Sequence, residues 1–411
     1  MRIIQDWLFL VWLLLLPFSW LISINTVYIA PDKFLSPILI ATGLLLLLRL
    51  PLSSSKYILM LSTLVLVFIL LKNISFVGDN ALYWELMWED LIKVGYFIIP
   101  LLCITSMRQF CRASWVVVIV AILGCVTVFL AAVGFLTLPI ERFESSRLGI
   151  EGLEKAIGLF VSYGDLAQYL VFSLFWVLVL PGIDIRAKKK LRYLIIRIGM
   201  FISIFFGLLG SQSRNVLLSI VLALLVYWVY KKYSGKQKNN QMAALFGLIS
   251  FGLLGFGLIG FYMNDIYSMA TNLGGTNARN TAGARLEQYL FAIDVFFKSP
   301  FFGADLETYK KMEGLIEYIH NMWLRLAAHG GLFAVIPMLM LFSYVFVKVK
   351  AAADLKEKSE EILVLIPYFF VLIFASMFYV AMGELFWALL GVAASYAVIS
   401  EPKTSNNVRS N

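Results

Sequence analysis

Long runs of apolar residues, separated by short polar breaks, follow one another along the whole chain. At about 1.5 Å per residue, a helical run of this kind can cross the roughly 30 Å hydrocarbon core of a bilayer. Twelve such runs lie at about residues 7–24, 34–49, 57–71, 91–107, 114–138, 163–182, 193–210, 214–230, 242–262, 321–347, 362–381 and 384–400. We therefore predict an all-α polytopic membrane protein with about twelve transmembrane helices.

Basic clusters between the runs predict how the chain is oriented. Residues 186–192 read "RAKKKLR", and lysines also gather at 231–238 and 348–358. Because cytoplasmic loops carry the excess of Lys and Arg, these three segments are predicted to face the cytoplasm. Counting runs from these anchors also puts 49–56, 108–113 and both termini on the cytoplasmic side.

The same count leaves three segments outside: 72–90, 139–162 and 263–320. The last is the longest, and a connection of that length in a compact protein is usually functional or disordered. It contains "ARLEQYLFAIDVFFKSP", where the helical spacing of apolar residues predicts an amphipathic helix. These residues stand at 286, 289, 290, 293, 296 and 297. Pro300 and Gly303 are expected to end that helix.

The predicted organisation is therefore simple. Residues 1–262 form transmembrane helices 1–9, and residues 263–320 form a large outer loop with short amphipathic helices. Residues 321–400 form helices 10–12, and residues 401–411 form a cytoplasmic tail. The first apolar run lacks a small-residue cleavage signal, so we interpret it as a retained span and not as a removed signal peptide.

Composition excludes several function classes. The chain is 61% hydrophobic and 14% charged, with a mean hydropathy of +0.86. The net charge of +9 is explained by the cytoplasmic loops, so we expect no nucleic-acid partner. The three cysteines lack metal-ligand spacing, and no phosphate loop or dinucleotide fingerprint is present. We therefore expect no metal and no cofactor, and the energy for any reaction must come from the substrate.

Three arginines are candidates for binding an anion. Arg214 stands at the outer end of an apolar run, while Arg279 and Arg285 lead into the predicted amphipathic helix. A helix start favours anions over cations, and a bound phosphate would satisfy the helix and an arginine together. The alternatives are an interfacial snorkelling side chain at 214 and solvated surface charges at 279 and 285.

His320 lies where the long outer loop re-enters the membrane. An imidazole there could act as a neutral base near pH 7, although a lone histidine is more often structural. We interpret the other histidine, His329, as structural. Lys93 lies close to the outer surface and could pair with Glu89 or hold a lipid phosphate.

Three stretches in order resemble one known family: "SQSRNVLL", then "GARLEQYLFAIDVFFKSPFFG", then "HNMWLRLAAHGGLFAVIPM". Together with "SYGDLAQYLVFSL" at 162–174, they are similar to the O-antigen ligase and polymerase superfamily, most closely to the enterobacterial lipopolysaccharide ligases. The resemblance covers about residues 160–345, and the first 150 residues match in hydropathy alone.

The resemblance implies a membrane glycosyltransferase of the GT-C-like type in the bacterial inner membrane, with its active site facing the periplasm. Arg214 and Arg285 would clamp a diphosphate, and His320 would activate an acceptor hydroxyl. Tyr318 stands where the family often has a second histidine, and the glutamate that often follows the His-Asn pair is missing. Further substrate-binding positions are Arg279, Tyr318, Asn321 and Lys93.

The expected activity is transfer of an undecaprenyl-diphosphate-linked O-antigen glycan to a sugar hydroxyl of lipid A–core. The transfer would invert the anomeric carbon and need no metal. Besides donor, acceptor and membrane lipids no partner is implied, and a monomer is the working expectation. A polymerase acting on lipid-linked repeats is the first alternative. A lipid-linked glycan transporter is the second, although its charges should lie at mid-membrane depth and not at the outer edge.

Overall fold

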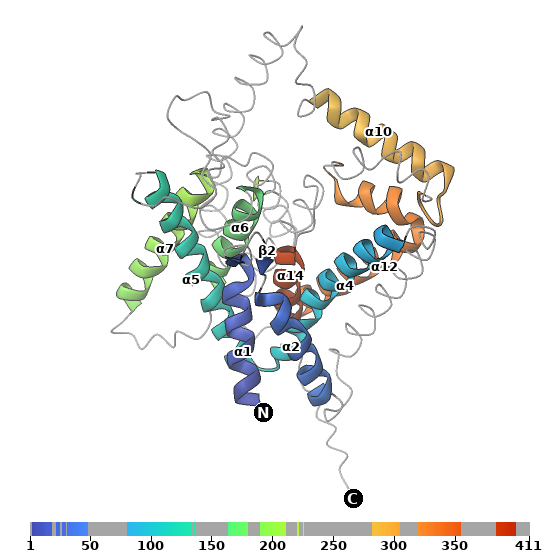
Figure 1. The fold of residues 1–411 in the computed structure, drawn as a ribbon. Coiled ribbons are helices and arrows are strands. Elements are labelled where there is room, and N and C mark those ends of the chain that lie inside the picture. The colour runs from blue at the N-terminus through green and yellow to red at the C-terminus, as the bar shows by residue number, and fades with distance from the viewer. Residues whose placement is uncertain are drawn as a thin grey trace, which may run out of the picture.

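A computed structural model describes the chain over residues 2–18, 22–24, 27–29, 31–47, 80–132, 135, 163–179, 190–210, 220–221, 225, 282–304, 319, 321–354 and 384–399. Within these residues the architecture is helical, with one short hairpin (Figure 1). The elements are α1 (Arg2–Leu15), η1 (Leu16–Phe18), β1 (Ile22–Ile24), β2 (Val27–Ile29), α2 (Pro31–Leu47), α4 (Asn80–Cys103), α5 (Met107–Ala132), α6 (Tyr163–Val179), α7 (Lys190–Gly210), α10 (Ala282–Lys298), α12 (Met322–Asp354) and α14 (Glu384–Ile399).

Apolar helices stand where the apolar runs predict them. Among the described helices, two are long and apolar enough to cross a membrane, Met107–Leu130 and Met322–Lys348. Shorter apolar helices occupy five further runs: Ile3–Leu15, Phe34–Gly43, Ile92–Cys103, Ile198–Leu208 and Leu385–Tyr396. The runs at 57–71, 242–262 and 362–381, and most of 214–230, lie outside the described residues. The number of twelve spans therefore stays a prediction.

The structure corrects the prediction of one helical span over residues 7–24, because the chain is not helical as far as residue 24. The α-helix ends at Leu15, and Pro17 lies in the short 3-10 turn that follows. Proline lacks a backbone N–H and disfavours the α conformation at the residue before it, so the helix stops there. The chain then forms an antiparallel hairpin in which Ile22 pairs with Ile29.

Several helices extend beyond their apolar runs. α4 begins at Asn80, inside the predicted outer segment 72–90, and α12 continues to Asp354, inside the predicted loop 348–358. Residues 108–113, predicted as a loop, form the first turns of α5. The reason is that an apolar run measures the hydrocarbon thickness, whereas a helix continues through the headgroup layer beyond it.

The turn between α4 and α5 lies beside the start of α1. Ser106 accepts a hydrogen bond from the Gln109 backbone N–H over 3.4 Å, and so caps α5. The Gln109 side-chain amide donates to Asp6 of α1 over 2.6 Å. The beginning of α1 and the α4–α5 turn therefore share one end of the helical bundle.

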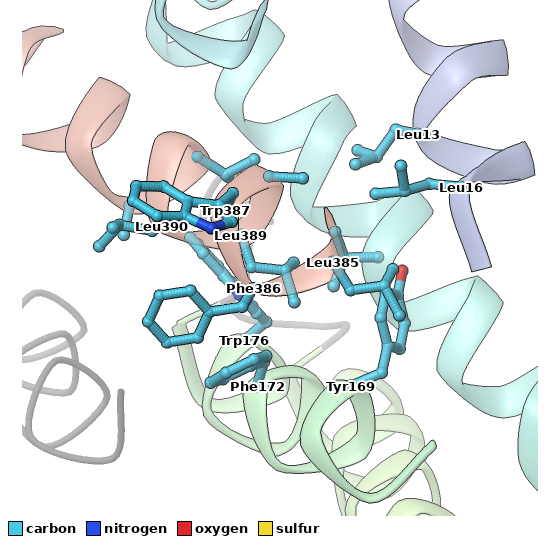
Figure 2. Close-up of a cluster of buried hydrophobic side chains, with 14 of the residues drawn as sticks. Leu13, Leu16, Tyr169, Phe172, Trp176, Leu385, Phe386, Trp387, Leu389 and Leu390 are labelled. Atoms are coloured by element: carbon cyan, nitrogen blue, oxygen red, sulfur yellow. The ribbon is translucent and has the colours of Figure 1, made fainter. Parts of the chain in front are cut away.

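The core is centred on α14, which packs against α4, α12, α5 and α6. Figure 2 shows its side chains meeting those of α6, α1 and η1. The labelled residues are Leu13, Leu16, Tyr169, Phe172, Trp176, Leu385, Phe386, Trp387, Leu389 and Leu390. Gly391 lets α14 approach α4 closely, since a Cβ there would collide with the carbonyl oxygen of Phe97. The buried hydroxyl of Ser395 donates to the Gly391 carbonyl over 2.8 Å, so this hydroxyl is paired although its surroundings are apolar.

Candidate active site at the junction of α10 and α12

The helix predicted inside the long outer segment is confirmed as α10, and it ends at Lys298, two residues before Pro300. Arg285 is its fourth residue, and its first turn contains no acidic side chain. The unpaired N–H groups of that turn concentrate positive potential at the helix start. An arginine there adds to that potential, so the start of α10 suits a bound anion.

After α10 the chain makes a tight turn. The Ser299 N–H donates to the Val295 carbonyl over 3.1 Å, and the Gly303 N–H donates to the Ser299 carbonyl over 2.9 Å. Gly303 has a φ of +74°, a left-handed conformation that glycine adopts without steric cost. The "SPFFG" stretch therefore reverses the chain directly behind the helix.

This turn is fixed to a kink in α12. At Gly331 the backbone has φ 58° and ψ −156°, which divides α12 into 322–330 and 332–354. The N–H groups of Leu332 and Phe333, freed from the helix by the kink, donate to the carbonyls of Pro300 and Phe301 over 2.8 and 3.2 Å. We call this set of backbone contacts between 300–304 and 328–333 the main-chain join.

The join leaves no room for a side chain at either glycine. A Cβ at Gly331 would overlap the backbone of Phe301 and lie 2.7 Å from the N atom of Phe302. A Cβ at Gly303 would lie 2.7 Å from the carbonyl oxygen of Ala328, which already accepts a 2.8 Å hydrogen bond from the Ala304 N–H. Glycine is thus required at both positions by space as well as by φ.

A small hydrophobic cluster packs between α10 and the beginning of α12. Its buried members are Ala292, Val295, Ala304, Ile319 and Ala328. Ile319 is fully buried in this cluster, so the chain immediately before α12 is anchored at the same junction as Ala292 and Val295 of α10. Two residues later, Asn321 accepts a 3.0 Å hydrogen bond from the Leu324 N–H and caps α12.

Three of the sequence-predicted site residues fall inside the described part of the chain. The backbone of Arg285 lies in the first turn of α10, and Asn321 caps α12 at the same junction. Lys93 is half-buried in α4, which packs on α14, α2 and α1. Arg214, Arg279, Tyr318 and His320 lie outside the described residues, although Ile319 and Asn321 flank His320 on both sides.

The backbone of His329 lies inside the main-chain join, and the structural role predicted for this residue stays a prediction. The structure also adds a residue that the sequence analysis missed. Gln288 is only 8% exposed, one turn after Arg285, and its Oε1 has no hydrogen-bond partner in the described structure. The available signal was a polar residue at a position that shares a helix face with Ala292 and Val295.

The two described helices that are long and apolar enough to cross a membrane agree with the membrane protein predicted from the sequence. In a comparison with protein-family models, residues 198–339 match the model described as O-antigen ligase. This confirms that the chain carries the domain of the O-antigen ligase and polymerase superfamily, over roughly a third of its length. No curated protein matches the chain.

The matched segment runs from α7 into α12 and is narrower than the resemblance seen in the sequence, leaving out 162–174. It contains all but one of the candidate site residues, the exception being Lys93. Both halves of the main-chain join also lie within it.

Proposed function

We propose that the protein is an O-antigen ligase. It transfers a glycan from undecaprenyl diphosphate to a sugar hydroxyl of lipid A–core, at the periplasmic face of the bacterial inner membrane. The membership of residues 198–339 in the O-antigen ligase family supports the reaction class. The junction of α10 and α12 is the proposed active site, and both termini lie in the cytoplasm.

The site rests on one observation: Ile319 belongs to the same buried cluster as Ala292 and Val295 of α10. His320 is covalently next to Ile319, and Arg285 is seven residues, about 10.5 Å, along the same helix from Ala292. By helical register, position 285 shares one face with 288 and 292. A bound diphosphate and an arginine side chain together can bridge such a gap.

The start of α10 is the proposed diphosphate site. Helix N–H groups and the Arg285 guanidinium both favour a doubly charged anion. Arg214 supplies the second guanidinium in the proposal, and Arg279, Tyr318, Asn321 and Lys93 are further binding positions. The combined positive charge stabilises the negative charge of the diphosphate, a role that a metal ion has in many sugar transferases.

The proposed reaction is a single displacement. The acceptor hydroxyl oxygen attacks the anomeric carbon and forms the new C–O bond, while the bond from that carbon to the diphosphate breaks. The electron pair goes to the leaving phosphate oxygen, where Arg285 and Arg214 stabilise it. Neutral His320 takes the hydroxyl proton. Because attack and departure occur on opposite faces, the anomeric configuration inverts.

The test uses purified full-length protein in liposomes with undecaprenyl-diphosphate-linked glycan and lipid A–core. Arg214→Ala, Arg285→Ala and His320→Ala should each slow transfer about a hundredfold or more, the effect of losing one contact worth about 3 kcal/mol in the transition state. Arg112→Ala is the matched control, because Arg112 is exposed on α5, outside the proposed site. Normal transfer by all three site variants at normal yield would refute the assignment.

The same assay separates the alternatives. A ligase moves glycan onto lipid A–core, whereas a polymerase lengthens the lipid-linked glycan when a second lipid-linked repeat is offered. A transporter changes the leaflet of the donor and leaves its glycosidic bond intact. The family match supports the superfamily that contains both enzymes, and the resemblance of the sequence to the enterobacterial ligases favours the first outcome.

A further inference from the structure

The bulky apolar side of α10 is not the side that packs against the protein. Residues on the packed face are Gln288, Ala292 and Val295, which are 8%, 1% and 4% exposed. The opposite face carries Leu290, Ile293 and Phe297, which are 58%, 38% and 74% exposed. At 100° per residue the centres of these two faces are roughly 180° apart. α10 therefore buries Gln288, Ala292 and Val295, holds Tyr289 and Phe291 partly buried against the same cluster, and leaves Leu290, Ile293 and Phe297 uncovered.

This uncovered stripe leads directly into more exposed aromatic rings. Phe301 and Phe302, in the turn after α10, are 58% and 62% exposed. Their ring centroids lie 6.4 and 5.0 Å from that of Phe333 on α12. We call Leu290, Ile293, Phe297, Phe301, Phe302 and Phe333 the apolar face.

The apolar face continues onto the membrane-crossing part of α12. From Phe333 an exposed stripe follows that helix through Ile336, Met340 and Val347, at helical spacing. In a transmembrane helix such a stripe is the surface that touches lipid chains. The exposed stripe of α12, the turn after α10 and the exposed side of α10 therefore form one continuous apolar surface.

A charged pair borders the stripe on α10. Lys298 and Asp294 form an exposed ion pair over 2.6 Å, and their positions lie 40° to 80° around the helix from Leu290. A helix with large apolar residues on one line and charges beside it is typical of a helix lying in the boundary between headgroups and acyl chains.

We propose that α10 and its turn are held in the bilayer by the apolar face, with the acyl chains of ordinary phospholipids as the occupant. The face lies in the outer leaflet, on the side where α12 begins, and the ion pair of Asp294 and Lys298 points to water. α10 is thus clamped between α12 and lipid, and it does not project freely from the membrane. This inference depends on the exposed residues and not on the proposed reaction.

The test places one spin label at a time on the full-length protein in nanodiscs of phosphatidylethanolamine and phosphatidylglycerol, without donor or acceptor. Cysteines replace Leu290, Ile293 or Phe297, or the control positions Asp294 and Lys298, after Cys103, Cys111 and Cys125 are changed to alanine. Collision with oxygen reports lipid, and collision with a water-soluble nickel chelate reports water. We expect oxygen to dominate at 290, 293 and 297 and the nickel chelate at 294 and 298, at least severalfold each way.

Other results would overturn the proposal. Nickel access at 290 and 297 equal to that at 294 means that water covers the face. Shielding from both probes means that a second copy or another protein covers it, and oxygen access that appears only with added donor means that the polyprenyl chain does. A photoreactive phenylalanine at 297, with the natural cysteines retained, provides an independent measurement. It should capture phospholipid in native membranes, whereas the same group at 294 should not.

Discussion

Replacing Gly331 with alanine should detach the turn after α10 from α12 while leaving the rest of the helical bundle in place. The φ of 58° and ψ of −156° at Gly331 are accessible to glycine and strained for alanine. Such strain costs roughly 1–3 kcal/mol. The added Cβ also overlaps the Phe301 backbone, so the two parts must separate.

Separation removes three hydrogen bonds, those that Leu332 and Phe333 donate to the turn and the one that Ala304 donates to Ala328. At a net value of about 1 kcal/mol each, and with the backbone strain included, the join loses on the order of 4–6 kcal/mol. That is a large part of the 5–15 kcal/mol that stabilises a typical domain. A local opening made easier by 3 kcal/mol is populated more than about a hundredfold more often.

Amide hydrogen exchange measures this directly. In Gly331→Ala, the amides of Ala304, Leu332 and Phe333 should exchange more than about a hundredfold faster, while those of α14 keep their protection. Gly199→Ala is the matched control, because no atom lies within 4 Å of a Cβ placed at Gly199 on α7. Alanine at that helical position should be neutral or stabilising by up to about 1 kcal/mol. Equal protection of the join in both variants would refute the reasoning.

Substitutions at three further positions test other contacts. Gly391→Ala should destabilise the purified protein by about 1–3 kcal/mol in thermal unfolding, since its Cβ meets the carbonyl of Phe97 and neither backbone can yield easily; a midpoint equal to wild type would contradict this. Gln288→Leu should raise stability by about 1 kcal/mol, because it removes a buried unpaired amide oxygen. A lower unfolding midpoint than wild type would contradict this. Asn321→Ala should cost about 1 kcal/mol through loss of the cap on Leu324, and Asn321→Asp should not.

Helix positions could be predicted from the sequence wherever hydropathy decides them. The apolar run at 114–138 becomes α5, and the spacing in 286–297 predicts α10 together with its end before Pro300. These features depend on local composition, periodicity and the chemistry of proline, and all three can be read from neighbouring residues.

The direction in which α10 faces could not be predicted in the same way. Its apolar positions mark a side that avoids water, but a membrane chain can bury such a side in protein or in lipid with similar gain. Only the packing of Ala292 and Val295 shows which side meets α12. The kink at Gly331 was hidden for a related reason, because "HGGLF" reads as an uninterrupted part of the apolar run.

The candidate site was only partly predictable. Arg285 and His320 attract attention as charged or titratable groups in an apolar chain. That Ile319 shares a buried cluster with Ala292 is a tertiary fact, and no local pattern encodes it. The burial of Gln288 could not be predicted, because an amide at one position of a helix does not reveal its surroundings in the sequence.

The contacts that unite the turn with α12 are made by peptide groups, and peptide groups are the same for every amino acid. The main-chain join therefore depends on the geometry of the backbone and not on the side chains of the residues that make its hydrogen bonds. Residues 301 and 302 are therefore free to change their bulk to suit a thicker or thinner bilayer. Positions 303 and 331 admit no alternative. In a saturation mutagenesis library across 299–333, positions 301 and 302 should accept many amino acids, whereas positions 303 and 331 should accept glycine alone.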